Sequence, residues 1–276
     1  MHRVDFIYNG KWVTRHPPEK WGELTLDQLL SFCKIMLSDL TPVKKRSALA
    51  LSFLGVKSRN KLVMNNAELM DIIKLQDFLF DTEADLTRFL TGSLSIKTIL
   101  GFSKTYHSPG DNLKHSTVGE VAFADSYLQR YILNKKDEDL CRLIAAIYRP
   151  SNLYRKFRHR LHGGDIRVTF NDNMARKRAE KFKFLPEYLK LAILYQFKGC
   201  RTMDVRNNPE LYEGKDEAAA SPFGWAGVII NMAGPEIGTI DQVENMLWSN
   251  AIVFLKKIEF DRKQMEEKFR TNNHTI

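Results

Sequence analysis

The sequence predicts a mainly α-helical protein, with one or more helical bundle-like domains and a small N-terminal β-hairpin. Apolar residues recur at helical spacing in about eight segments along the chain. Several of these segments follow a Thr that has Gln or Glu three residues later, which is the spacing of a helix capping box. Strands that alternate with helices would indicate a parallel sheet, and the sequence shows β-prone runs only at the hairpin.

The N-terminal part is expected to contain the hairpin and three helices. Residues 4–14, VDFIYNGKWVT, hold two β-prone runs joined by Asn9-Gly10, a dipeptide that tolerates the positive φ angles of a type I′ turn. A helix over 26–37 is predicted from Thr25 and Gln28, which have capping-box spacing. The next helix starts after the N-cap Thr41 and stops near residue 55, and a third covers 67–80.

A linker is predicted over 103–117, because SKTYHSPGDNLKHST has the Gly, Pro, Asn and Ser content of a loop. The chain is therefore divided into an N-terminal hairpin and helical subdomain, 1–108, and a C-terminal helical subdomain, 109–276. The helices expected in the second part cover 118–133, 137–149 and 173–183, then 186–199 with Gly199 at its end, and finally one long helix from 240 to about 269. Residues 201–224 are interpreted as a surface loop.

Composition indicates an intracellular globular protein. The chain has 276 residues, is 43% hydrophobic and has no run of about 18 apolar residues that could cross a membrane. Its three cysteines, Cys33, Cys141 and Cys200, form no CxxC pair and are interpreted as free thiols. The pair His159 and His162 comes nearest to a metal site but lacks further ligands, so neither a metal nor a cofactor is expected.

No catalytic signature is present in the sequence. A P-loop, a GxGxxG loop and a GxSxG elbow are all missing. Asp27, Glu120, Asp125 and Asp241 lie near predicted helix starts, where a negative charge complements the helix dipole without any catalytic role. The protein is therefore expected not to be an enzyme, and no catalytic residue is proposed.

Positive charge is concentrated in one segment, residues 153–183. This segment contains ten Lys or Arg residues and three acidic residues, so it carries a net charge of +7 out of the chain's +9. Three interpretations are open: an acidic protein partner, a phosphate backbone, or a solvated surface. The candidate partner-binding residues are Arg155, Lys156, Arg158, Arg160, Arg176, Lys177, Arg178 and Lys181.

Aromatic residues are interleaved with these cations and allow two interpretations. They could stack on bases of a nucleic acid, or they could face a helical core and leave the charges solvated. Within the predicted helix 173–183 the second interpretation places the cations on one polar face, with Met174, Phe182 and Phe184 pointing inward. The aromatic residues in question are Tyr154, Phe157, Phe170, Phe182 and Phe184.

Several phrases occur in an order that resembles proteins from the tail-morphogenesis regions of tailed bacteriophages and related prophages, especially those of Bacteroides-like hosts. They are PEKWGELTLDQLL near the start, STVGEVAFADSYL and LIAAIYRP in the middle, and FGWAGVIINMAG followed by GTIDQVENM near the end. The similarity spans most of the chain but consists of helix starts and aromatic or Pro positions. It supplies no motif of reactive groups, so no functional residue is transferred from it.

The resemblance implies a tail assembly chaperone or a minor structural component that acts without catalysis through protein–protein contacts. Its partners would be other tail or virion proteins, among them the tape-measure protein, and no membrane. It would act in the host cytoplasm during assembly or be retained in the virion. The alternative is a nucleic-acid-binding protein or nuclease that uses the basic segment 153–183.

Overall fold

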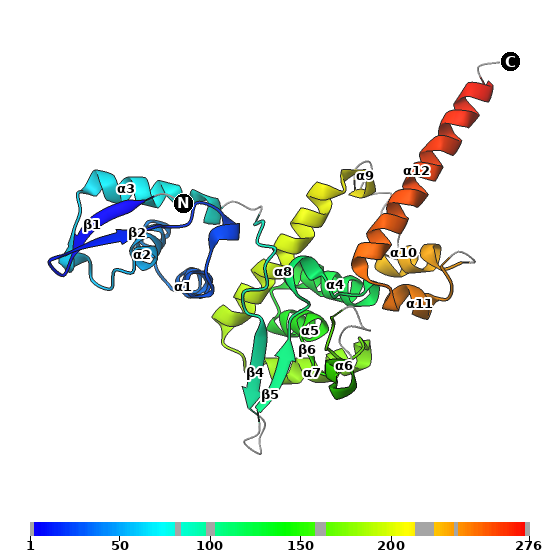
Figure 1. The fold of residues 1–276 in the computed structure, drawn as a ribbon, viewed down its shortest axis with the longest axis horizontal. Helices are drawn as coiled ribbons and strands as arrows, with labels where there is room; N and C mark the ends of the chain where they lie inside the picture. The colour runs from blue at the N-terminus through cyan, green and yellow to red at the C-terminus, as the bar shows by residue number, and fades with distance from the viewer. Residues whose placement is uncertain are drawn as a thin grey trace. The chain divides into compact units, whose positions relative to one another are not determined.

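A computed structural model describes residues 3–80, 84–97, 103–157, 164–212, 224–234 and 237–273. The described residues are mainly α-helical, as predicted. The chain divides into two compact units. Figure 1 shows the fold, coloured from the N-terminus to the C-terminus by residue number. The first comprises Met1–Thr91 and Leu185–Thr202, and the second Gly92–Phe184 and Met203–Ile276. The division thus falls between Thr91 and Gly92, earlier than the predicted boundary at 108/109.

The first unit begins with the predicted hairpin. Strands β1 (Val4–Tyr8) and β2 (Lys11–Arg15) pair antiparallel, with Tyr8 opposite Lys11 across the turn. Asn9 and Gly10 have φ angles of 52° and 74°, the positive values that a type I′ turn needs. A short third strand, β3 (Leu62–Val63), pairs with the other edge of β1, so the hairpin is part of a three-stranded sheet.

The first unit also contains three helices, α1 (Leu26–Met36), α2 (Pro42–Phe53) and α3 (Asn66–Leu75). Helices α2 and α3 pack with the sheet through Ala50 and Ile72, and α1 packs against α2. The capping box of Thr25 and Gln28 is present at α1, as predicted. The predicted third helix is shorter than expected, since α3 ends at Leu75 and only a 3₁₀ turn, Asp77–Leu79, follows.

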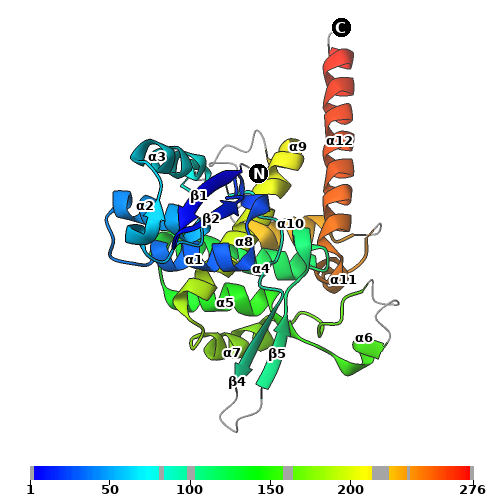
Figure 2. The same ribbon diagram turned by 60° about the vertical axis from the view of Figure 1, so that its left-hand side comes forward.

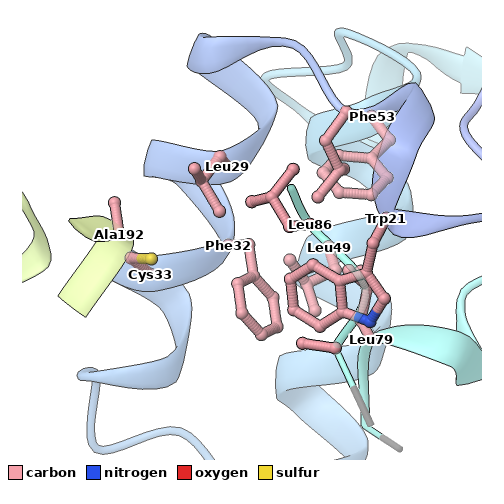
Figure 3. Packing of buried hydrophobic residues seen from close by; sticks show 11 residues of the cluster. Trp21, Leu29, Phe32, Cys33, Leu49, Phe53, Leu79, Leu86 and Ala192 are labelled. Carbon is pink, nitrogen blue, oxygen red and sulfur yellow. The ribbon is translucent and has the colours of Figure 1, made fainter. Parts of the chain in front are cut away.

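One hydrophobic cluster of the first unit contains Trp21 (Figure 3), and a second lies between the sheet and helices α2 and α3. The Trp21 ring meets Phe32 edge to face at 5.4 Å between centroids and stacks on Tyr195 at 5.3 Å. Leu29 and Leu49 are fully buried in the same cluster. Because Tyr195 comes from α8 (Glu187–Asn207), a segment distant in sequence completes this core.

Helix α8 does not end at Gly199 as predicted but continues to Asn207. Gly199 is buried, and a Cβ built on it would lie 2.4 Å from the carbonyl oxygen of Leu86. Glycine is thus required by a crossing of two backbones and not by a helix stop. The expected loop 201–224 correspondingly contains the last turns of α8 and the short helix α9 (Pro209–Tyr212), while residues 213–223 lie outside the described residues.

The second unit contains a sheet that the sequence did not predict. Strand β4 (Ser93–Lys97) pairs antiparallel with β5 (Ser103–His107), and β5 pairs with the short β6 (Arg149–Pro150). The stretch SKTYH was expected to belong to a linker and is β5 instead. Its residue Tyr106 is buried against Phe182, with 5.1 Å between ring centroids, so tertiary packing favours the strand.

Helices α4 (Val118–Asn134), α5 (Asp137–Ile147) and α7 (Asp172–Phe182) form the centre of the second unit. Thr117 and Glu120 make the predicted capping box of α4. Residues 140–147 are all buried except Arg142, and Ala175 and Ala179 let α7 approach α5 closely. The one-turn helix α6 (Leu153–Phe157) precedes α7.

The expected long C-terminal helix is two helices, α11 (Ile240–Asn245) and α12 (Trp248–Asn273). The break follows from backbone hydrogen bonds on both sides of Leu247, from Val118 N–H to the Met246 carbonyl and from Trp248 N–H to the Ser116 carbonyl. The capping box of Thr239 and Gln242 is present as predicted. Helix α10 (Gly224–Met232) precedes them, and the C-terminal half of α12 extends away from α10 and α11 in both ribbon views (Figures 1 and 2).

Candidate functional site

The predicted partner-binding cations do not share one environment. Lys156, Arg176, Lys177 and Lys181 are exposed, and Arg155 is half-buried. Arg158 and Arg160 lie outside the described residues, as do His159 and His162. The exposed cations of α7 are therefore accessible to a partner, as the sequence suggested for this helix.

Arg178 was predicted to lie on the exposed polar face of α7, and this prediction is wrong. Its side chain is buried and its Nη2 donates to the carbonyl oxygen of Ala145 at 3.0 Å, so it joins α7 to α5. Met174 and Phe184 were expected to point inward, and both are exposed. Phe182 is buried as predicted. The buried face of α7 thus includes an arginine because the Ala145 carbonyl lies within its reach.

The aromatic residues of the basic segment are mostly on the surface. Phe157 is 85% exposed, Phe184 is 87% exposed and Tyr154 is also exposed. Phe170 is half-buried and contacts Phe123, with 5.6 Å between ring centroids. The interpretation that these residues all face a helical core is therefore wrong for three of the five.

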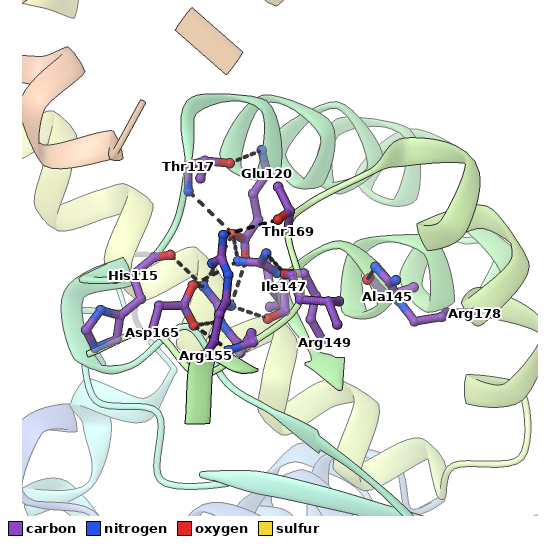
Figure 4. Close-up of polar contacts among 12 residues, drawn as sticks. His115, Thr117, Glu120, Ala145, Ile147, Arg149, Arg155, Asp165, Thr169 and Arg178 are labelled. Atoms are coloured by element: carbon purple, nitrogen blue, oxygen red, sulfur yellow. Dashed lines mark hydrogen bonds and ion pairs between the residues drawn. The ribbon is translucent and has the colours of Figure 1, made fainter. Parts of the chain in front are cut away.

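A buried charge network lies at the start of α4 (Figure 4). Glu120 is fully buried and accepts hydrogen bonds from two arginines, from Arg167 Nη1 at 2.8 Å and from Arg149 Nη2 at 2.7 Å. Asp165 accepts from Arg167 Nε at 2.9 Å and from Arg149 Nη2 at 3.4 Å. Two carboxylates and two guanidinium groups thus balance one another within the fold.

Backbone groups satisfy most of the remaining donors of this network. Arg167 donates to the carbonyls of Ile147 and His115, at 2.9 and 2.6 Å. Arg149 donates from Nη1 to the carbonyl of Val168. The network therefore fixes the segment around residues 165–168 against the start of α4 and the end of α5.

The pKa values of the network reflect burial and pairing together. Burial alone would raise the pKa of Asp165, but the positive charge and hydrogen bonds of Arg167 outweigh it and hold that pKa below its usual value. Burial lowers the pKa of Arg149 to about 10, against the opposing attraction of Glu120. Burial also acts to lower the pKa of Arg167, but Glu120 and Asp165 overcome it and raise that pKa.

Asp165 should make stability depend on pH below about 4. Its pKa is lower in the folded state than the value of about 3.9 for an unfolded chain. Its contribution is therefore complete above the unfolded pKa and is lost as the pH falls through the folded pKa. Urea unfolding between pH 7 and pH 2.5 should show a shallower acid loss for Asp165→Asn than for the parent. The exposed Asp261→Asn is the control, and equal slopes for Asp165→Asn and the parent would contradict the assignment.

An open groove lies elsewhere on the second unit, walled by three helices and the residues just before α7. Its volume is about 590 Å³. Phe123 of α4 and Ile230 of α10 line it, and Ile230 is 54% exposed. Arg176 stands at one edge, with its guanidinium carbon 5.9 Å from the centroid of the Phe123 ring. The full lining is Gly119, Ala122, Phe123, Ser126, Phe170, Asn171, Asp172, Trp225, Ala226, Ile229, Ile230, Ile240, Asp241, Glu244 and Asn245.

Two tryptophans connect the helices around the groove. Trp225 Nε1 donates to Asp125 at 2.9 Å, which joins α10 to α4, and the Trp225 ring meets Trp248 at 5.5 Å. Trp248 Nε1 in turn donates to Asp204 at 2.8 Å. Hydrogen-bonded tryptophans thus join the helices around the groove. The lining combines apolar side chains, among them Phe123 and Ile230, with the carboxylates of Asp172, Asp241 and Glu244.

The cysteines and the possible metal ligands of the described residues form no further site. The three cysteines are buried and form no disulfide with one another, as the sequence indicated, and burial raises the pKa of Cys33 to about 12. Within the described ranges, His, Cys, Asp and Glu residues form no group of three or more that could hold a metal ion. No helix in the described part of the chain combines the length and apolar character needed to span a membrane.

Neither the buried charge network nor the groove was predicted from the sequence. Glu120 was recognised only as a helix cap, whereas Arg149 and Arg167 reach it from 29 and 47 residues away in the chain. Arg149 stands before Pro150 and Arg167 between Ile166 and Val168, and neither position indicates in the sequence that the arginine is buried. Comparison with protein-family models, curated proteins and solved structures gives no match for this chain.

Proposed function

We propose that this chain is a non-enzymatic assembly protein of bacteriophage tails that binds an apolar helical segment of another tail protein in the groove between α4, α10 and α11. The observation that carries the proposal is the open groove with its exposed Ile230. An amphipathic helix can insert apolar side chains into such a groove, which is a common mode of protein recognition. The resemblance to tail-morphogenesis proteins supports the choice of partner.

The tape-measure protein is the partner that this proposal favours. A long helical protein exposes apolar faces until it is assembled, and a chaperone would cover them. Arg176, beside the ring of Phe123, lies at the edge of the groove and can meet an acidic residue that flanks the apolar face of the bound helix. The exposed cations Lys177 and Lys181 on the same helix increase the rate of such an encounter.

Ile230→Glu should lower capture of the co-expressed tape-measure protein of the same phage or prophage about tenfold or more, because a charge would be buried in an apolar contact. Val253→Glu is the matched control, since Val253 is 68% exposed on α12 and does not line the groove. Circular dichroism shows whether both variants fold. If the parent does not capture this partner, or if Ile230→Glu captures as much as the parent, the proposal is wrong.

Nucleic acid is the second candidate ligand because exposed aromatic residues neighbour cations in the chain. Tyr154 and Phe157 flank Arg155 and Lys156, and Phe184 follows Lys183. Exposed rings beside cations can stack on unpaired bases while the cations contact phosphates. This arrangement favours single-stranded nucleic acid over duplex.

Charge reversal separates this candidate from the first. Replacing Arg176, Lys177 and Lys181 by Glu avoids the buried Arg178 and should leave stability nearly unchanged, because exposed charges contribute little. The control reverses three exposed lysines of α12, Lys257, Lys263 and Lys268. Under the assembly proposal, both triple variants bind a single-stranded oligonucleotide as weakly as the parent at about 150 mM salt. A selective loss of steeply salt-dependent binding in the α7 variant would support the nucleic-acid function instead.

A further inference from the structure

We propose that a pocket beside the start of α4 binds a small molecule that carries an oxyanion, a phosphate or a carboxylate, attached to an apolar group. The pocket has a volume of about 290 Å³ and lies entirely within the second unit. It includes Arg155, Thr169 and Phe170 in its walls. The inference does not depend on the tail-assembly proposal, since it concerns a different cavity and is tested without a protein partner.

Arg155 is positioned to contact the oxyanion. Its Nη2 donates to Thr169 Oγ1 at 3.1 Å, and both residues line the pocket. That hydrogen bond uses one of the five N–H donors of the guanidinium and holds the group at the wall. A guanidinium fixed in this way can bind a phosphate or carboxylate with two parallel hydrogen bonds.

The buried network behind Arg155 leaves positive charge at this pocket. Glu120 and Asp165 compensate Arg149 and Arg167, so the charge of Arg155 has no counterpart within the network. Arg149 also lines the pocket, is nine-tenths buried or more, and its Nε has no acceptor among the described residues. One buried donor at the pocket wall is therefore left unsatisfied, beside the uncompensated charge of Arg155.

Asp165 is the one carboxylate in the pocket wall, and its oxygens are already occupied. Oδ1 accepts from the backbone N–H of Arg167 at 3.0 Å and from its Nε at 2.9 Å. Oδ2 accepts from Arg149 at 3.4 Å and from Arg167 Nη2 at 3.3 Å. The two arginines therefore compensate the negative charge of Asp165, which reduces its repulsion of a bound anion.

The rest of the pocket favours an anion joined to an apolar body. Thr117, the N-cap of α4, also lines it. Phe170 and Leu247 supply apolar surface. The volume is close to the lower limit of about 300 Å³ for small-molecule pockets, which is more than a bare phosphate ion fills.

The test uses phenyl phosphate and benzoate as probes, with inorganic phosphate as the reference, in titrations followed by isothermal calorimetry at low salt. Either aromatic probe should bind the whole chain more tightly than inorganic phosphate, because only the aromatic probes contact Phe170 and Leu247. Arg155→Gln should weaken that binding about tenfold or more. Arg176→Gln is the matched control, because Arg176 is an exposed arginine that does not line this pocket.

Thr169→Val provides a second variant that keeps every charge. It removes the acceptor that holds Arg155 and should weaken binding of the same probe by a smaller factor than Arg155→Gln. Binding of phenyl phosphate but not benzoate assigns a phosphate ligand, and the reverse assigns a carboxylate. The proposal is overturned if neither aromatic probe binds at about 10 mM, or if Arg155→Gln and Arg176→Gln bind alike.

Discussion

Glu120→Gln is expected to destabilise the second unit by about 3–5 kcal/mol, although it changes neither the size nor the shape of the side chain. Glu120 is fully buried, and each of its oxygens accepts a hydrogen bond from a guanidinium. In either orientation, the glutamine amide directs its NH₂ group at a donor of Arg149 or Arg167. The substitution also leaves two buried cations with one carboxylate, Asp165.

Two control variants, compared with Glu120→Gln by urea unfolding, show how much of the lost stability comes from the buried charge of Glu120. Glu138→Gln breaks the i,i+4 pair with Arg142 on α5, which is partly exposed, and should cost at most about 1 kcal/mol. Thr117→Ala removes the side-chain acceptor at the N-cap of the helix on which Glu120 lies and should cost about 1 kcal/mol. If Glu120→Gln costs no more than Thr117→Ala, Glu120 acts only as a helix cap and the two arginines do not depend on it.

The basic segment 153–183 is thus divided among several roles. Arg167 and Arg178 are buried and stabilise the fold through Glu120 and the Ala145 carbonyl. Arg155 lines the pocket that we propose for an oxyanion. Arg176 and the lysines of α7 remain on the surface. Net charge along the sequence could not distinguish these positions, because burial of an arginine depends on acceptors that the fold brings from elsewhere.

Local signals in the sequence predicted local structure well. The capping boxes at Thr25, Thr117 and Thr239 are all present, and the Asn9-Gly10 turn has the expected backbone angles. Each of these features is complete within about four residues, so its physical cause lies in neighbouring residues of the sequence.

Features that depend on distant segments were missed. Strand β5 was taken for a linker because its burial rests on Phe182, which lies far along the chain. The groove was not predicted because its lining comes from α4, α10 and α11 together. The break before α12 was likewise hidden, since hydrogen bonds to Ser116 and Val118 interrupt an apolar pattern that otherwise continues.

At Gly199 a local effect, helix propensity, opposes a contact with a distant segment, the backbone at Leu86. The larger of the two decides whether Gly199→Ala raises or lowers stability. Helix propensity alone favours Gly199→Ala by about 1 kcal/mol, because Gly199 lies inside α8. A Cβ there would lie 2.4, 2.6 and 2.7 Å from the carbonyl oxygen, nitrogen and carbonyl carbon of Leu86. These are backbone atoms, so relief requires the chain at Leu86 to move, together with its buried side chain.

We expect Gly199→Ala to destabilise the first unit by roughly 3 kcal/mol, because overpacking against backbone exceeds the gain in helix propensity. Gly22→Ala is the control, since Gly22 lies in the same unit and a Cβ there meets nothing within 4 Å. Urea unfolding is followed by tryptophan fluorescence in a Trp225→Phe/Trp248→Phe background, so that the buried Trp21 reports on the first unit. A stability equal to or above that of the parent would mean that Leu86 does not cross α8 at Gly199, and the glycine would then be only an unfavourable helix residue.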